Sequence, residues 1–583
     1  MLRSVTVLVL FAFSAAADDA ADLRAARAVF EENIEAIHQR DRAKYLSLYL
    51  HSESLVRTGP AGFATGYEDF AKGAGAEWPD TLEVTDMRLT PIRPGIVYGS
   101  YRYRVRYGAN ETSGISERLF VETPEGWRIA LTGAVGTVGV PPSPRAIRGA
   151  TLIDGRGGAP VANANIVVRD GKIDCAGTDC AIPAGIDVVD ARGMFVTPGL
   201  VDAHVHFSQT GWADGRPDAL DVRAAHPYAE TVARLKKEPE RFARAWLCSG
   251  ITSVFDVGGY PWTLALHERA DTSWPHVTAA GPLLSTLDHW VNVPAERQFI
   301  HLKSEESGRE GVRYLAAHGA KAIKVWYVEE NAAALAAAGD EAAKAKVPLI
   351  VHATELAGAK AAVRAGAKLL VHSVWDGVVD DELIALMKEQ GTILSPTLTV
   401  MGGYLRMFES VASRTAPAID DPNKCVDPKT AAKIASTAAL DKSLVNAETL
   451  SRRAARTAER ERMGAANLKR LADAGIPIAT GTDAGNPLTL HGPSIYAEME
   501  AMQKAGMTPM QVIVASTSVA ARAARLDDVT GTIEKGRDAD LLILAADPTK
   551  DVANFRRIRS VMRGGVLRGI EELSAMARAS SPP

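Results

Sequence analysis

The chain has 583 residues, of which 46% are hydrophobic and 23% charged, the ordinary mixture of a packed globular protein, so wholesale disorder, collagen-like repeats and coiled coils are excluded. Lysine and arginine number 66 against 70 aspartates and glutamates, a net charge of -4, which leaves no basic excess to bind nucleic acid or an anionic lipid surface. Four cysteines are too few for a disulfide scaffold or a cysteine-based zinc array.

The N-terminus is typical of an export signal. Arg3 precedes a short apolar run from Val5 to Phe13, and the small residues Ala15–Ala17 stand before Asp18, in the order of a secretory signal peptide. We therefore predict a signal peptide over residues 1–17 and an exported protein, either periplasmic or secreted. The run is too short to span a bilayer, so no membrane span is expected in the mature chain. An uncleaved N-terminal anchor is the alternative.

Residues 22–138 are predicted to form a separate α+β domain. Apolar residues between Leu23 and Ile37 recur at helical spacing, and alternating segments such as Tyr98–Tyr107 and Glu117–Glu122 indicate strands. The last hairpin, Ser116 to Ala130, resembles nuclear transport factor 2-like (SnoaL-like) cone domains. That resemblance implies an α+β cone, and we expect an accessory role because the segment shows no catalytic Asp–His pair.

Both ends of the remaining chain are predicted to build one small β module. A proline-rich linker, Pro141–Pro144, precedes it. Short strands and turns fill residues 145–198, including a hairpin over Ile166–Ile173 with an Asp-Gly turn, and they recur over residues 530–570. A β-sandwich made from both flanks must enclose whatever lies between them.

Residues 199–529 alternate apolar strands with Ala-rich helical stretches such as Asn331–Lys346. Eight strand candidates can be counted: Gly199–Phe207, Ile251–Val257, His276–Leu284, Ala322–Val328, Pro348–Thr354, Lys368–Val374, Ile393–Val400 and Ile476–Thr482. Eight βα units in one domain predict an α/β fold, a (β/α)8 TIM barrel. An irregular insertion is expected over Met401–Asp441, after strand seven, where a barrel would carry it over the mouth as a lid.

The strongest functional signal is a set of polar residues that interrupt apolar strands near their carboxyl ends. His204 and His206 lie two apart on the first strand, so both side chains face the barrel axis. The others stand on strands four, five, six and eight: Lys324, His352, His372 and Asp483. Buried charge without a partner is costly, so six such residues at one mouth predict a divalent metal. Imidazole and carboxylate ligands suit zinc among other ions.

These motifs resemble the amidohydrolase superfamily from residue 145 to residue 569, including Thr197–His206 and the tail Gly531–Leu541. The surroundings of His352 and Asp483 are similar to its prolidase-like (Xaa-Pro dipeptidase-like) group.

The resemblance implies a ligand set for two divalent metals. His204, His206 and Asp483 would bind the more buried metal, and His352 and His372 the more exposed one. Lys324 would be N-carboxylated and bridge both.

For such a site the resemblance implies hydrolysis of a carbon–nitrogen bond in a small molecule. In such a site the metals would supply an activated water for attack on the carbonyl, and Asp483 would take its proton and pass it to the leaving amine. We expect peptide-like or N-acyl amino acid substrates, with a cyclic amide, lactone or carbamate left open. His491, His289 and Tyr228 follow strands eight, three and one, and are candidate substrate-binding residues.

One feature departs from the two-metal pattern. Glu355 follows His352 as His-x-x-Glu, where single-metal deaminases and imidazolonepropionase-like members of the superfamily place an acid/base glutamate. Those members lack the strand-four lysine, so Lys324 favours two metals, and Glu355 then reads as an acid in a first helical turn. The alternatives are a single-metal hydrolytic deaminase or cyclic amidase, and a non-catalytic binding protein. The sequence leaves homo-oligomerisation open.

The four cysteines have different sequence surroundings. Cys175 and Cys180 flank a Gly-Thr-Asp turn and are equally compatible with a local disulfide, which export would permit, or with two free thiols. Cys248, at an apolar helix end, is expected to be a packed thiol. Cys425 is left without an assignment.

Overall fold

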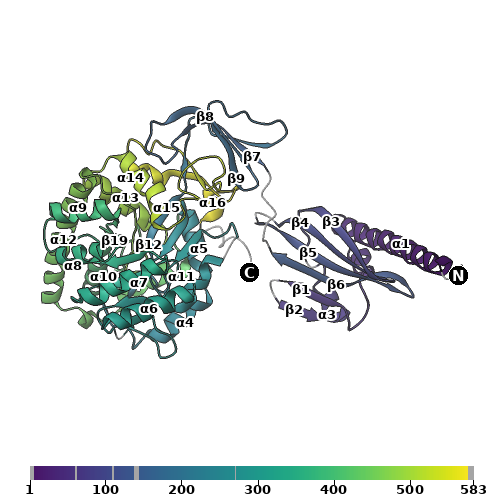
Figure 1. Ribbon diagram of the computed structural model, residues 1–583, viewed down its shortest axis with the longest axis horizontal. Coiled ribbons are helices and arrows are strands. Elements are labelled where there is room, and N and C mark those ends of the chain that lie inside the picture. Colours follow the sequence, from purple (N-terminus) through teal and green to yellow (C-terminus); the bar gives the residue numbers. More distant parts are fainter. Residues whose placement is uncertain are drawn as a thin grey trace. The chain divides into compact units, whose positions relative to one another are not determined.

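The computed structural model describes residues 5–59, 62–75, 77–107, 110–136, 144–268, 271–289 and 291–574. Contacts divide the chain into two units, Met1–Pro141 and Pro142–Pro583 (Figure 1). Residues 137–143, which hold most of the predicted Pro141–Pro144 linker, lie outside the described residues. No helix in the described ranges has the length and apolarity that a membrane crossing requires.

The first unit has three helices and one curved sheet. The helices are α1 (Val5–His38), α2 (Arg42–Ser47) and α3 (Tyr67–Gly73). The strands are β1 (Val56–Gly59), β2 (Gly62–Thr65), β3 (Thr81–Arg93), β4 (Ile96–Tyr107), β5 (Asn110–Thr123) and β6 (Gly126–Gly136), in the order β2-β1-β6-β5-β4-β3. Phe30 of α1 packs edge-on against Tyr101 of β4, with ring centroids 4.9 Å apart. The helix thereby closes the apolar face of the sheet.

Both flanks of the second unit contribute to one mixed sheet, ordered β23-β22-β21-β11-β7-β8-β9 with β10 beside β7. The strands are β7 (Arg145–Leu152), β8 (Val161–Arg169), β9 (Lys172–Gly177), β10 (Asp187–Asp190), β11 (Phe195–Pro198), β21 (Leu541–Leu544), β22 (Ile558–Arg563) and β23 (Val566–Gly569). The predicted turn joins β8 to β9, and both Asp170 and Gly171 have the positive φ, 52° and 77°, that a tight hairpin needs. The hydrogen bonds form a single sheet where two facing sheets were expected.

Between the flanks, parallel strands run in two arcs. One contains β12 (Leu200–Val205), β13 (Ile251–Asp256) and β14 (His276–Ala279); the other contains β15 (Leu283–Ser285), β16 (Phe299–His301), β17 (Ile323–Trp326), β18 (Leu349–His352), β19 (Ala367–Val371) and β20 (Ile393–Ser395). The arcs are joined where the Lys321 N–H donates to the Ala279 carbonyl at 3.0 Å. Helices surround this ring (Figure 1), in the alternation expected of a barrel.

The eighth predicted strand, Ile476–Thr482, is not a regular strand. It makes isolated bridges only, and Pro477 lacks the N–H that a ladder requires. Its backbone nevertheless closes the ring, because the Pro477 carbonyl accepts from Leu394 N–H at 3.0 Å and the Thr480 carbonyl accepts from Ala203 N–H at 2.9 Å.

The helices of the second unit are α4 (Tyr228–Lys237), α5 (Glu240–Cys248), α6 (Glu305–Ala317), α7 (Ala332–Lys344), α8 (Leu356–Arg364), α9 (Asp381–Gln390), α10 (Val400–Ser413), α11 (Pro428–Ser436), α12 (Ala447–Asp473), α13 (Ser494–Lys504), α14 (Pro509–Ala515), α15 (Ser518–Ala523) and α16 (Ile570–Leu573). Short 3-10 helices are η1 (Ala213–Gly215), η2 (Pro261–Glu268), η3 (Thr437–Ala439), η4 (Lys442–Leu444) and η5 (Val552–Arg557). Most of these helices pack their apolar sides on the strands in one large core. Helices α10 and α11 form a separate apolar cluster with Trp212 and Leu488, and α15 packs in another with Val201 and Phe255.

The insertion after strand seven is helical, which corrects the expected irregular segment over Met401–Asp441. It contains α10, α11 and η3. The pair Gly402-Gly403 interrupts the helical pattern in the sequence because glycine disfavours helices. In the structure, the backbone of α10 at Gly403 lies close to the backbone of Pro487. A Cβ at this position would lie 2.6 Å from the Pro487 carbonyl oxygen. The absent side chain therefore lets α10 pack on the loop that follows the eighth segment.

Both cysteine pairs are bridged. Cys175 joins Cys180, and Cys248 joins Cys425 across 177 residues. The expectation that Cys248 is a packed free thiol is therefore wrong. Its partner stands in an aperiodic stretch before α11, so no local pattern signals the pairing.

Candidate metal centre

The carboxyl ends of the barrel segments open into a cavity of about 280 Å³. All six residues predicted as metal ligands line it: His204, His206, Lys324, His352, His372 and Asp483. They stand on or directly after β12, β17, β18, β19 and the irregular eighth segment. The structure thus brings the complete predicted set to one place.

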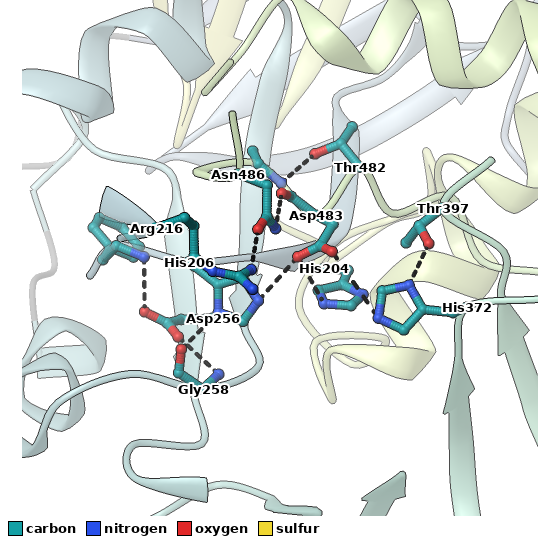
Figure 2. A network of polar contacts seen from close by, with 12 residues as sticks. His204, His206, Arg216, Asp256, Gly258, His372, Thr397, Thr482, Asp483 and Asn486 are labelled. Carbon is teal, nitrogen blue, oxygen red and sulfur yellow. Dashed lines mark hydrogen bonds and ion pairs between the residues drawn. The ribbon is translucent and has the colours of Figure 1, made fainter. Parts of the chain in front are cut away.

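The tightest part of the cluster is formed by His204, His206 and Asp483. Oδ1 of Asp483 lies 3.3 Å from Nε2 of His204 and 3.0 Å from Nε2 of His206. Figure 2 shows both rings turned toward this carboxylate. The Asp483 N–H also donates to the His204 carbonyl at 2.7 Å, so the backbone contact that closes the ring fixes the carboxylate beside the histidines.

His206 is oriented by its second ring nitrogen. Nδ1 lies 2.6 Å from the carbonyl oxygen of Gly258, just beyond β13. Since a carbonyl only accepts, Nδ1 is the donor, and in the neutral ring Nε2 then has a free lone pair. This is how metal-binding histidines are commonly held.

A second group of imidazoles lies next to the first. Nε2 of His372 is 4.0 Å from Oδ2 of Asp483, and the His352 and His372 ring centroids are 4.3 Å apart. Nδ1 of His372 lies 2.6 Å from Oγ1 of Thr397, after β20. His372, Thr397 and Asp483 all have positive φ, of 72°, 47° and 63°. Such backbone strain, about 1–3 kcal/mol each, is typical of functional sites.

Lys324 is the third component of the cavity. It is 3% exposed, and burial lowers its pKa to about 7 despite the opposing charge of Asp483. A substantial fraction of this amine is therefore neutral, and hence nucleophilic, near neutral pH.

The protonation states fit a divalent cation. Burial lowers the pKa of His204 to about 4 and takes the pKa values of His352 and His372 well below the usual range, so these rings are neutral at pH 7. Burial alone would raise the pKa of Asp483, but the adjacent His204 and His206 outweigh it and hold that pKa well below its usual value. Among the described residues, Oδ1 of Asp483 and Nδ1 of His204 are buried and have no hydrogen-bond partner. A buried carboxylate oxygen in this state, beside neutral imidazoles, suits a divalent cation.

Two further buried carboxylates, which sequence reasoning missed, hold the loops of this site. Asp202 accepts from Thr482 N–H at 2.9 Å and from its hydroxyl at 2.6 Å, and Asp256 accepts from the N–H groups of Gly258 and Phe207. Burial raises the pKa of Asp202 to about 7. The signal available was an aspartate inside the apolar run before His204.

The three predicted substrate-binding residues lie in different positions relative to the cavity. His289 lines the cavity. Tyr228 stands behind Gln298, which also lines it, and accepts from that amide at 2.9 Å. His491 is not among the lining residues: its ring is stacked on Phe242 with centroids 3.7 Å apart, and Nε2 lies 3.0 Å from the His206 carbonyl. That geometry makes His491 a positioning group for the His206 backbone.

The mouth also carries a polar network that sequence reasoning missed. Arg216 and Asp218 form a two-pronged ion pair at 2.9 and 2.7 Å. The Tyr404 hydroxyl donates to Asn486 at 2.5 Å, and the Asn486 amide donates to the Asp483 carbonyl at 3.0 Å. Figure 2 shows Arg216 and Asn486 next to Asp483.

Glu355 has a different placement. It directly precedes α8, is exposed, and does not line the cavity.

Comparison with known proteins gives one consistent picture. A family model described as "Amidohydrolase family" matches residues 195–568. Ochratoxinase of Aspergillus niger is 26% identical over 457 residues, covering 70% of this chain and 84% of that protein. Imidazolonepropionase of Deinococcus deserti is 26% identical over 445 residues, covering 71% and 92%. A crystal structure of a Xaa-Pro dipeptidase with bound methionine in the active site has a TM-score of 0.56 at 23% identity, covering 73% of this chain and 100% of that one, and shows the fold.

Proposed function

The chain belongs to the amidohydrolase family and is a hydrolase of carbon–nitrogen bonds, and from this premise we propose that it cleaves a peptide-like or N-acyl amino acid bond at a centre of two divalent metals. The observation that carries the proposal is the cluster of Asp483 with neutral imidazoles and a buried lysine in one cavity.

The ligands divide into two groups. His204, His206 and Asp483 would hold one metal, since their ligand atoms all lie within 4.8 Å of one another. His352 and His372 would hold the other, and Lys324, N-carboxylated, would serve both. The lowered pKa of Lys324, about 7, supports this modification because only a neutral amine adds to carbon dioxide. Zinc suits the imidazole and carboxylate set.

When bound, the metals supply Lewis-acid polarisation of the scissile carbonyl and lower the pKa of water. The chain's own residues provide the rest. Asp483, ionised and buried, accepts the proton released from water on its carboxylate and returns it to the leaving amine nitrogen. Gly258 and Thr397 fix the rings of His206 and His372. The products are a carboxylate and an amine.

The walls of the cavity favour an apolar group on the substrate. Aromatic side chains line it, including Phe299, Trp326 and Trp375. Similar proteins include an ochratoxinase and a Xaa-Pro dipeptidase. Their names also favour dipeptides and N-acyl amino acids as substrates.

A single-metal cyclic amidase is the second candidate, favoured by the likeness to imidazolonepropionase. Two placements argue against it. Glu355, its expected acid/base group, is exposed and outside the cavity, whereas Lys324 lies inside it.

The deciding experiment combines elemental analysis of the reconstituted protein with a hydrolysis screen of dipeptides and N-acyl amino acids. Two metals per chain and equimolar release of amine and carboxylate are expected. One metal with release of ammonia, or with opening of a ring amide, would instead support the second candidate. A protein that binds metal and hydrolyses none of these compounds would contradict the proposal.

We further propose that residues 1–17 direct export to the periplasm or medium, and that the first unit is a nuclear transport factor 2-like cone with an accessory role. The two disulfides support an oxidising compartment. The order of helices followed by a curved sheet supports the cone.

A further inference from the structure

Helix α12 brings an arginine to the cavity that holds the metal cluster. Arg453 lines this cavity together with Tyr404 and Met401 of α10. Its guanidinium carbon lies 4.0 Å from the centre of the Phe408 ring, also on α10. The aromatic ring supports the flat face of the guanidinium and leaves its edge for another partner.

That edge has no protein partner within the described residues. No carboxylate there lies within ion-pair distance of Arg453, and its buried Nε makes no hydrogen bond. The contrast with Arg216 is direct: Arg216 lines the same cavity but is neutralised by both oxygens of Asp218. On the outer face of α12, Arg452 also pairs, with Glu448 at 3.4 Å.

The surroundings increase the positive potential at this point. Burial lowers the pKa of Arg453, and Arg456 one turn further lowers it again, although Tyr404 opposes both. An arginine stays charged under such shifts. A half-buried cation without a counterion costs free energy, and this cost is recovered when an anion enters the cavity.

We propose that Arg453 binds the carboxylate of the substrate and thereby selects anionic amides, such as N-acyl amino acids and dipeptides with a free C-terminus, over neutral ones. This inference rests on the proposed function, because it assigns the substrate class of the same cavity. The fork of a guanidinium matches both oxygens of a carboxylate, and the aromatic walls accept the adjacent apolar side chain.

The test compares two substrates that differ in one group, N-acetyl-L-phenylalanine and N-acetyl-L-phenylalaninamide, by acetate release from the metal-loaded full chain. The acid is expected to have a kcat/KM about 10- to 100-fold higher, the value of a charge-assisted pair. Arg453→Met, which keeps the packing on Phe408, should remove this preference mainly through KM and leave the amide unchanged. Arg453→Lys should restore part of it. Arg452→Met, on the outer face of the same helix, is the matched control and should behave as wild type.

A binding measurement separates this inference from the proposed function. 3-Phenylpropionate and 3-phenylpropanamide are titrated calorimetrically into the same metal-loaded proteins, with no turnover required. Weaker binding of the acid to Arg453→Met, with the amide unaffected, supports the inference even if no amide is hydrolysed. Equal binding of the acid to wild type and to Arg453→Met overturns the inference. Hydrolysis of the two acetyl substrates at equal rates also overturns the inference, but it leaves the proposed function intact.

Discussion

Oδ1 of Asp483 lies 3.0 Å from Nε2 of His206, whose Nδ1 donates to the Gly258 carbonyl on the other side of the ring. Among the described residues, this buried carboxylate oxygen has no hydrogen-bond partner. A cation that the carboxylate and the imidazole hold together would stabilise it. The contact between Asp483 and His206 links the backbone closure of the barrel, which places Asp483, to the chemistry of the cavity.

Asp483→Asn tests this relationship. The amide keeps the shape of the side chain but removes its charge, so metal content should fall by at least one equivalent. Turnover should fall by about 10³-fold or more, since a general base contributes about 10²–10⁴. Elemental analysis and steady-state kinetics are the measurements. Asp218→Asn, at the mouth, is the control and should retain both metals; full metal content in Asp483→Asn would contradict the ligand assignment.

Lys324→Ala decides between the two-metal and single-metal readings. If its carboxylate serves both metals, the variant should lose at least one metal and most activity, with part restored by bicarbonate or acetate. Because the pKa of Lys324 is about 7, its amine is mostly protonated below that pH and mostly neutral above it. Reconstitution of wild type with metal and bicarbonate should therefore be faster at pH 8 than at pH 6.

Glu355→Gln is the counterpart and should leave turnover near normal, because Glu355 is exposed and outside the cavity. Circular dichroism checks that both variants fold. Two results would instead favour a single metal. One is a folded Lys324→Ala enzyme with full metal content and normal turnover, and the other is a Glu355→Gln enzyme with strongly reduced turnover.

The six candidate metal ligands in the cavity could be predicted from the sequence, because a polar residue at the end of an apolar strand visibly breaks the pattern. Arg453 could not be, since arginines are common on a polar helix and only the packing of α12 on α10 brings it to the cavity. His491 follows the eighth segment as a substrate contact would, and only its stacking on Phe242 reveals a positioning role. Long-range contacts of this kind leave no trace in local periodicity.

The bridge between Cys248 and Cys425 should contribute strongly to stability. It closes a loop of 177 residues, for which the chain-entropy model gives about 5 kcal/mol. The Cys175–Cys180 bridge closes only a short loop and should contribute about 2 kcal/mol in the same model. Thermal unfolding of the Cys248→Ala/Cys425→Ala and Cys175→Ala/Cys180→Ala variants measures both. A smaller loss of Tm in the first variant than in the second would contradict the ranking.

Removing the first unit should leave the metal centre intact. All six cavity ligands belong to the second unit, so a chain lacking residues 22–138 should bind the same number of metals and hydrolyse the same substrates within a few-fold. Elemental analysis and kinetics of the truncated protein are the measurements. A truncated protein that keeps its circular dichroism but loses metal would show that the first unit completes the site.

Glu498 should make stability depend on pH in a direction opposite to that of most carboxylates. It is fully buried on α13 and accepts from the N–H groups of Leu398 and Thr399 at 2.7 and 3.0 Å. Burial raises its pKa from 4.5 to about 7, against the effect of these hydrogen bonds. The folded chain therefore binds this proton more tightly than the unfolded chain, so the contribution is most favourable below pH 4.5 and declines as the pH rises to 7.

The size of this decline follows from the shift, about 3 kcal/mol between pH 4.5 and 7. Glu498→Gln does not titrate, so its free energy of unfolding, measured by denaturant titration and subtracted from that of wild type, should reveal the decline as a difference that changes with pH. A pH-independent difference in the free energy of unfolding is expected in addition, because the substitution also alters the hydrogen bonds of this side chain. A difference that stays flat across this window would mean that Glu498 is ionised throughout and that its three hydrogen bonds to the start of α10 outweigh the cost of burying its charge.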